Sequence, residues 1–248
     1  MATAPRQRRT REIEYPTSDG KPMAETELHR DEMIDLIQTL EDHFALENMI
    51  CVSGDLLLFY EEGDRRKHVS PDVFVVRGVE KKRRDHYLVW KEGRAPDLVI
   101  EITSKSTRRE DQKKKWEIYR DSLRVSEYIL FDPTEDYLKP PLQGFRLVGG
   151  DYAAIEFVDG RLPSDVLGLH FERVGGELRL FDPVTGTRLP KRDEDRDDAR
   201  RRAEVEHQRA EAEHQRAEAA EAVRNELAEE NERLRREVEA LRRAVEGA

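Results

Sequence analysis

The sequence has few aromatic residues, a single cysteine and no long apolar run. Aromatic residues are 7% of the 248 residues, and none follows Phe181. A lone Cys51 excludes an intrachain disulfide and a zinc site built from cysteines, and its apolar neighbours predict that it packs in a core. No stretch is long and apolar enough to cross a bilayer, and the basic N-terminus lacks the apolar part of a secretory signal. We therefore expect a cytoplasmic protein with no membrane partner.

Charged residues are abundant instead. They make up 40% of the chain, hydrophobic residues 37%, and the mean hydropathy is -0.85. This is too polar for one globular domain throughout. We expect a flexible N-terminal segment over 1–15, a globular domain over 16–190 and a charged helical tail over 191–248. The net charge of -10 disfavours loose nucleic-acid binding, yet residues 81–84 and 105–115 concentrate positive charge. These basic segments either steer a phosphate backbone or are solvated surface.

The stretch from 96 to 133 is predicted to form a strand, a helix and a second strand. In the first strand Asp97 and Glu101 share a face, because strand side chains alternate. A carboxylate within an apolar strand is costly to bury alone, so Glu101 faces water, pairs with a lysine or belongs to a site. The order β-α-β favours a parallel pair with a right-handed crossover.

The helix of this stretch is predicted over 108–121. Thr107 and Glu110 have the spacing of a capping box, which would open the helix near residue 108. Asp111, Lys115 and Tyr119 then share one face at i, i+4 and i+8. Lys115 can thus be aimed at one place while neighbouring side chains point elsewhere.

A second acid lies upstream, in Asp72 at the start of an apolar run over 72–76. If this run pairs antiparallel with 97–102, Asp72 and Glu101 are neighbours. Two adjacent carboxylates repel unless a cation lies between them, and oxygen ligands suit Mg²⁺ or Mn²⁺. The pair therefore predicts a metal site, beside which a lysine could stabilise charge on a phosphate or position a water.

These pieces, in this order, resemble the Uma2 family, also called domain of unknown function 820 or putative restriction endonucleases. The resemblance spans roughly 25–190 and rests on Pro71-Asp72, Ala95 to Ile102, Asp111, Lys115, Tyr119, Glu127-Tyr128, Phe131 to Pro133, Leu142 to Phe145 and Leu167 to Leu169. It implies the PD-(D/E)XK nuclease-like superfamily and an endonuclease acting on DNA. The expected metal ligands are Asp72 and Glu101, and the expected cofactor is Mg²⁺ or Mn²⁺.

The sequence departs from the superfamily signature at one position. The signature puts a lysine two residues after the acid, where this chain has Thr103. The resemblance then points to a lysine displaced to the following helix, Lys115, as the catalytic amine. Lys105 is a second candidate, and Asp97 is a second-tier helper on the strand of Glu101. Glu25, Glu32 and His29 on the first helix could join the site, but such residues more often lie on a solvated face.

The predicted fold is α/β, with a restriction-endonuclease-like core: a mixed sheet flanked by helices. The first helix runs to about Leu46 with an apolar stripe, and Thr26 or a neighbouring residue is expected to cap its start. Segments 50–52 and 56–60 are the first strands. Segments 145–147, 153–157 and 178–181 predict a small antiparallel β-extension that serves as scaffold.

The tail predicts a coiled coil. Residues 206–212 repeat as 213–219, and one heptad position holds leucine, the other asparagine or valine; the first is Leu227, Leu234 and Leu241, the second Asn231, Val238 and Val245. This pattern favours a homodimer that forms through the tail. The alternative is that the tail is a single solvated helix. For the whole chain, the alternative to a DNA endonuclease is a non-catalytic interaction protein that keeps the nuclease fold and assembles through its tail.

Overall fold

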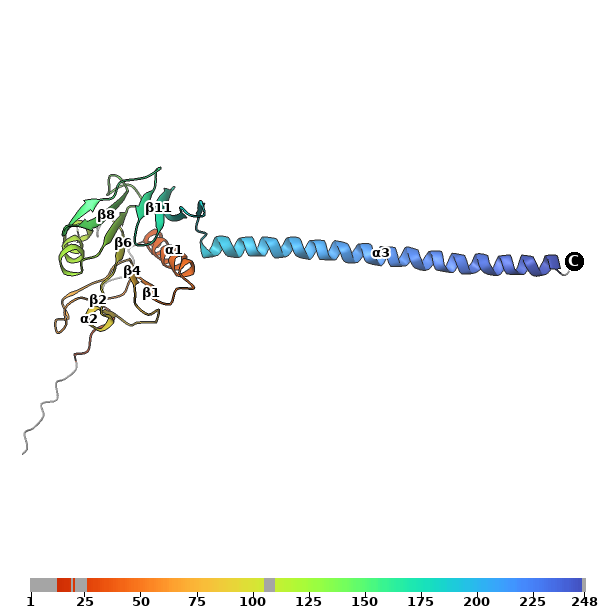
Figure 1. Ribbon diagram of the computed structural model, residues 1–248, viewed down its shortest axis with the longest axis horizontal. Helices are drawn as coiled ribbons and strands as arrows, with labels where there is room; N and C mark the ends of the chain where they lie inside the picture. The colour runs from red at the N-terminus through yellow and green to blue at the C-terminus, as the bar shows by residue number, and fades with distance from the viewer. Residues whose placement is uncertain (1–12, 19, 21–25, 105–109, 247–248) are drawn as a thin grey trace, which may run out of the picture. The chain divides into compact units, whose positions relative to one another are not determined.

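The structure is a computed structural model that describes residues 13–18, 20, 26–104 and 110–246. It divides into two units, Met1–Arg192 and Asp193–Ala248. The first unit is mixed α/β, as predicted, and the second consists of one long helix (Figure 1). None of the helices in the described part of the chain is both long and apolar enough to span a membrane.

A six-stranded mixed sheet is the centre of the first unit. Its strand order is β1-β4-β6-β7-β8-β9, and β6 and β7 are parallel while the other neighbours are antiparallel. The strands are β1 (Ile50–Ser53), β4 (Val73–Arg77), β6 (Leu98–Ile102), β7 (Glu127–Phe131), β8 (Leu142–Val148) and β9 (Asp151–Ala154). Strands β4 and β6 pair antiparallel, which is the condition on which the predicted metal site depends, and β6 and β7 form the predicted parallel pair.

One face of this sheet packs against helix α1 (Glu27–His43) and a second sheet. Alternate strand residues such as Val73, Val75, Leu98 and Ile100 point to this side and are fully buried. The second sheet is antiparallel and comprises β10 (Leu162–Ser164), β11 (Leu169–Val174), β12 (Glu177–Asp182) and β13 (Thr187–Arg188). Helix α1 begins after Thr26, whose side chain accepts the His29 N–H, so the predicted cap is confirmed.

The opposite face holds the other set of alternating residues, among them Phe74, Val76 and Val99. Two π-helical segments, η1 (Glu110–Lys115) and η2 (Ile118–Ser122), cover it together with a three-stranded sheet. That sheet comprises β2 (Leu58–Phe59), β3 (His68–Val69) and β5 (Tyr87–Leu88), followed by the short helix α2 (Val89–Glu92). Cys51 is 4% exposed in this core, as predicted.

Two parts of the unit differ from the prediction. Segments 145–147 and 153–157 do not belong to a separate extension, because β8 pairs with β7 and β9 pairs with β8 at the edge of the main sheet. Strand β9 also ends at Ala154. In addition Tyr15, the last residue of the segment expected to be flexible, packs on Phe59 and Trp90 at ring distances of 5.0 and 5.3 Å. Its hydroxyl accepts the Gly63 N–H, so Tyr15 is part of the folded unit.

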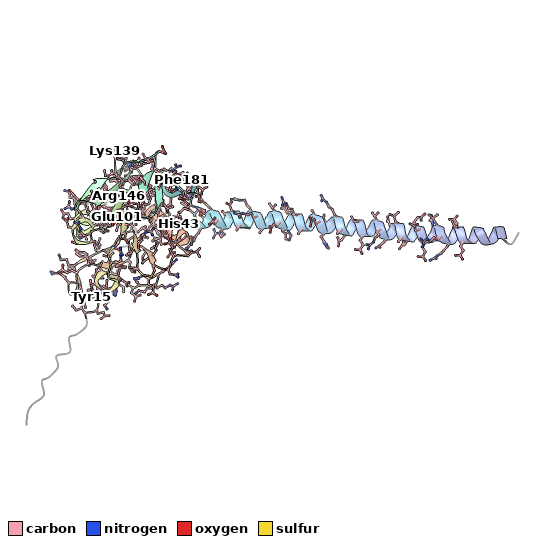
Figure 2. All side chains as sticks on the ribbon, viewed as in Figure 1. Tyr15, His43, Glu101, Lys139, Arg146 and Phe181 are labelled. Atoms are coloured by element: carbon pink, nitrogen blue, oxygen red, sulfur yellow. The ribbon has the colours of Figure 1, made fainter. Side chains whose placement is uncertain are left out.

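Helix α3 (Arg192–Glu246) forms the second unit. The side chains that Figure 2 draws on this helix project outward, and those of Val223, Leu227, Leu234 and Val238 are about half exposed. Intrahelical ion pairs join Glu230 to Arg233 and Glu232 to Arg236. The helix therefore carries apolar residues that the unit itself does not bury.

A buried glutamate joins α1 to the second sheet. Glu32 is 3% exposed and accepts the Leu178 N–H at 2.5 Å. Burial raises the pKa of Glu32 from its ordinary 4.5 to about 7, despite this hydrogen bond and the nearby Lys191. Between these two values the folded state keeps a proton that the unfolded state has lost, so the group lowers stability as pH rises.

The change Glu32→Gln should consequently stabilise the protein more at pH 8 than at pH 5. The amide keeps an oxygen for Leu178 and carries no charge, so the gain should reach up to about 3 kcal/mol. Urea denaturation at several pH values measures it. Glu27→Gln, at an exposed position of the same helix, controls for loss of a negative charge. A pH-independent effect of Glu32→Gln would contradict the assignment.

Candidate active site

Two carboxylates lie side by side at one end of the main sheet. In the β4–β6 register Val73 opposes Ile100, so continuing it by one residue sets Asp72 opposite Glu101. Directly opposed residues share a face of the sheet. The two acids therefore point to the same side, as the sequence predicted, and Glu101 lies in the body of the first unit (Figure 2).

Asp72 is held by groups from two elements. Its Oδ2 accepts the Ile102 N–H at 2.7 Å and lies 3.1 Å from Nε2 of His29 on α1. Burial by itself would raise the pKa of Asp72, but the hydrogen bond from His29 and the charge of Lys115 outweigh it and hold that pKa below its usual value. Asp72 is therefore a carboxylate at neutral pH.

Glu101 is fully buried and has two partners from the π-helical segments. Lys115 Nζ donates to its Oε2 at 2.7 Å, and the Tyr119 hydroxyl donates to its Oε1 at 2.5 Å. Lys115 and Tyr119 thus share a face, as predicted. The helix bonds here are wider than in an α-helix, for example from the Leu123 N–H to the Ile118 carbonyl, and π-helical turns are frequent at functional sites.

The two layers of the unit meet at this end of the sheet. Helix α1 covers one face and delivers His29, while the π-helical segments cover the other and deliver Lys115. A buried acid pair is repulsive unless cations or donors compensate it. Four side chains from four elements, His29, Asp72, Glu101 and Lys115, consequently form one charged cluster.

The backbone beside Asp72 is fixed by a close approach. Asp55 N–H donates to the Pro71 carbonyl at 2.9 Å, which brings Gly54 against the next residue. A Cβ atom at position 54 would lie 2.0 Å from the Asp72 carbonyl oxygen and 2.7 Å from Cδ1 of Ile37. Only glycine fits there without moving the strand that carries Asp72.

The donors at this site are few. Across the described residues, no group of three or more histidine, cysteine, aspartate and glutamate side chains is close enough to enclose a metal ion. Mg²⁺ is usually bound by one or two carboxylates and keeps several of its waters. Two carboxylates on one face therefore fit Mg²⁺ better than an ion that needs ligands from the protein on all sides. Thr103, at the signature position of the lysine, is 2% exposed, and its hydroxyl has no hydrogen-bond partner among the described residues.

Comparison with known proteins identifies the relatives of this unit. The Uma2 family, described as "Putative restriction endonuclease", matches residues 3–185. The chain belongs to the Uma2 family. This membership supports a nuclease role.

A solved structure is similar to part of the chain. It is described as a putative nuclease belonging to DUF820 from Anabaena variabilis ATCC 29413, and the match has 17% sequence identity and a TM-score of 0.44. The match covers 61% of this chain and 81% of the solved chain. No curated protein is significantly similar to the chain.

Other residues predicted for the Uma2 site lie elsewhere. Asp97 is four residues before Glu101, about 13 Å along the strand. Its carboxylate accepts the Arg77 N–H at 2.6 Å and lies 3.4 Å from Arg94, so it is not part of the cluster. Lys105 lies outside the described residues, as does the predicted capping box at Thr107. Glu32 also stays out of the cluster, because it bonds to β12.

The basic segment 81–84 is partly tied down by a carboxylate, because Arg84 and Lys82 contact Glu92, while Lys81, Lys82 and Arg83 remain exposed. Arg84 is bidentate to Glu92 at 2.9 Å for each contact, and its side chain is 5% exposed. Lys82 lies 3.4 Å from the same carboxylate. These contacts lower the pKa of Glu92, chiefly through the hydrogen bond from Arg84. The two cations therefore hold the loop to α2, which is a structural role.

His29 is the cluster member that sequence reasoning left aside. It precedes Met33, Leu36 and Leu40 at helical spacing, so it lies on the buried stripe of α1, and it is 5% exposed. A polar residue continuing an apolar stripe was the available signal. The spacing alone could not reveal that this end of the helix meets Asp72.

Removing Lys115 should cost stability as well as chemistry. The change Lys115→Met leaves Glu101 buried without its cation, which typically costs about 3–5 kcal/mol. A second change in the same chain, Glu101→Gln, removes the stranded charge and keeps an acceptor for Tyr119, so it should restore most of the loss. Chemical denaturation of the two single variants and the double variant measures this coupling. If the effects simply add, the ion pair does not stabilise the fold.

Proposed function

We propose that the chain is a metal-dependent endonuclease that hydrolyses phosphodiester bonds of DNA, with Asp72 and Glu101 as metal ligands and Lys115 as the catalytic amine. The observation that carries this proposal is the opposed carboxylate pair with an amine 2.7 Å from one member. Membership of a family described as restriction endonucleases directs the proposal to DNA.

The metal of this proposal is Mg²⁺ or Mn²⁺, because two carboxylates supply the hard oxygen ligands that these ions prefer. When bound, the ion supplies a Lewis acid for a phosphoryl oxygen and a more acidic water. Asp72 is suited to the role because its lowered pKa keeps it ionised. His29 and the Ile102 N–H fix its orientation, so His29 is a positioning residue.

Lys115 supplies positive charge next to the acids. Its ammonium group is on a flexible stem and carries three N–H donors, so it can exchange Glu101 Oε2 for a phosphate oxygen or for the attacking water. The Tyr119 hydroxyl would keep Glu101 in place during that exchange. Loss of one preorganised electrostatic group of this kind costs about 10²–10³ in rate.

One observation favours the alternative of a non-catalytic interaction protein. Both oxygens of Glu101 are already bonded to protein donors, and the side chain is fully buried. The cluster could then be only a structural ion pair. The two functions differ in a simple way: a structural pair needs no divalent ion and gives no cleavage.

Cleavage of mixed DNA substrates with Mg²⁺ tests the proposal. We expect Asp72→Asn and Glu101→Gln to lose at least about 10²-fold in rate. The matched control is Glu127→Gln, since Glu127 is a buried acid on the neighbouring strand, 1% exposed and bonded to Arg146 and Ser164. It should cost stability without a comparable loss of cleavage by the folded protein.

The same assay assigns the amine. Lys115→Ala and Lys105→Ala are compared, with rates divided by the folded fraction measured by circular dichroism. Loss only in Lys115→Ala supports the assignment. Loss of cleavage only in Lys105→Ala would assign the catalytic amine to Lys105 and leave the rest of the proposed mechanism unchanged. Cleavage unchanged by loss of either carboxylate would overturn the proposal.

Metal binding has a readout that does not depend on cleavage. Mg²⁺ that binds only the folded state raises its stability by about 2.7 kcal/mol at one hundred times the dissociation constant. We therefore expect Mg²⁺ to raise the melting temperature of the wild-type protein and not of Asp72→Asn. An equal response of both proteins would place the ion elsewhere.

A further inference from the structure

The end of helix α3 carries apolar residues in a heptad pattern. Leu227 and Leu234 occupy one repeating position, here called d, and Arg224, Asn231 and Val238 occupy the other, called a. Leu241 and Val245 continue the two positions in the sequence. Leu227, Leu234 and Val238 are 59%, 47% and 50% exposed on a helix that is otherwise highly charged. A solvated helix does not need a leucine every seventh residue.

We infer that residues 220–246 pair with the same segment of a second copy of this chain as a parallel, in-register, two-stranded coiled coil. Valine at a with leucine at d favours two strands over three or four. This inference does not depend on the proposed nuclease activity.

The charges beside the seam select the parallel orientation. Positions g and e flank the a and d residues, and between residues 230 and 242 position g is Glu230 and Glu237 while position e is Arg235 and Arg242. In a parallel pair each g residue faces the e residue five positions later on the other copy. Glu230 then faces Arg235, and Glu237 faces Arg242. An antiparallel pair would bring g against g and e against e, which sets like charges together.

Asn231 fixes the register. A polar residue at one a position costs least when it meets the same residue on the partner, so it penalises shifted alignments and higher oligomers. In the single helix its Nδ2 donates to the Leu227 carbonyl at 2.9 Å. The amide has a second N–H and an oxygen acceptor, so it can keep this bond and still pair with the second copy.

The same pattern marks where the pairing stops. Upstream d positions are Glu206 and Glu213, and the a positions beside them are Ala203 and Ala210. In a parallel, in-register pair each of these glutamates would lie against the same glutamate of the second chain, and the alanines beside them would bury little apolar surface. The paired segment should therefore begin near Ala220. A parallel pair puts both Uma2 regions at the same end of the coiled coil.

The first test is the mass of the full chain by analytical ultracentrifugation. We expect twice the chain mass of 29.0 kDa, dissociating on dilution because only about three heptads carry the seam. Leu234→Glu should give the single-chain mass. The control is Val205→Glu, at a residue of the same helix that is 48% exposed and off the seam. A wild-type monomer, a trimer, or equal masses for the two variants would overturn the inference.

Orientation is tested by cross-linking single cysteine variants at two a positions, Arg224→Cys and Val238→Cys, under mild oxidation. Both should give disulfide-linked dimers, because only a parallel, in-register pair brings each residue against itself at two separate positions. Val205→Cys is the off-seam control, and buried Cys51 is present in every sample. Linkage at one position alone, or at neither, would exclude this orientation.

A charge exchange tests the flanking pairs. Glu230→Arg and Arg235→Glu each turn two attractive contacts per dimer into repulsive ones, and each should weaken dimerisation roughly 3- to 10-fold. The double variant carries both changes and restores the opposite charges, so it should return to near the wild-type dissociation constant. Additive weakening in the double variant would show that these residues do not face each other.

Discussion

The antiparallel register of β4 and β6 is the constraint on which the first unit depends. It sets Asp72 beside Glu101, and two neighbouring carboxylates resist folding until cations and donors compensate them. Helix α1 places His29 beside Asp72, and the π-helical segments place Lys115 beside Glu101. The packing of both layers is therefore tied to the charge balance of a single residue pair.

Buried acids elsewhere in the unit show what sets this pair apart. Glu127 accepts bonds from the Arg146 guanidinium, the Ser164 hydroxyl and the Asp165 N–H. Asp132 accepts four backbone N–H groups and a hydroxyl in the turn that follows β7, and these bonds outweigh burial and lower its pKa. Most of those donors are fixed by the fold. Glu101 instead accepts its bonds from two side chains, the Lys115 amine and the Tyr119 hydroxyl.

The sequence was informative where local rules decide the structure. Thr26 caps α1, and Lys115 and Tyr119 share a face, because each follows from side-chain chemistry or periodicity. The sequence was less informative where distant contacts decide. It could not show that His29 reaches Asp72 or that β8 and β9 extend the main sheet, since both depend on which element packs beside which. The contacts of Lys82 and Arg84 with Glu92 are a third example.

Gly54 gives the site an unusual dependence on a residue with no side chain. The strand that carries Asp72 and the loop after β1 are so close that a methyl group at position 54 would overlap the Asp72 carbonyl. Any side chain at position 54 is consequently excluded by geometry unless the strand moves. A survey of tolerated substitutions would group Gly54 with Asp72 and Glu101, although Gly54 has no side chain that could take part in chemistry. Intolerance to mutation in this protein is therefore a poor guide to which residues take part in a reaction.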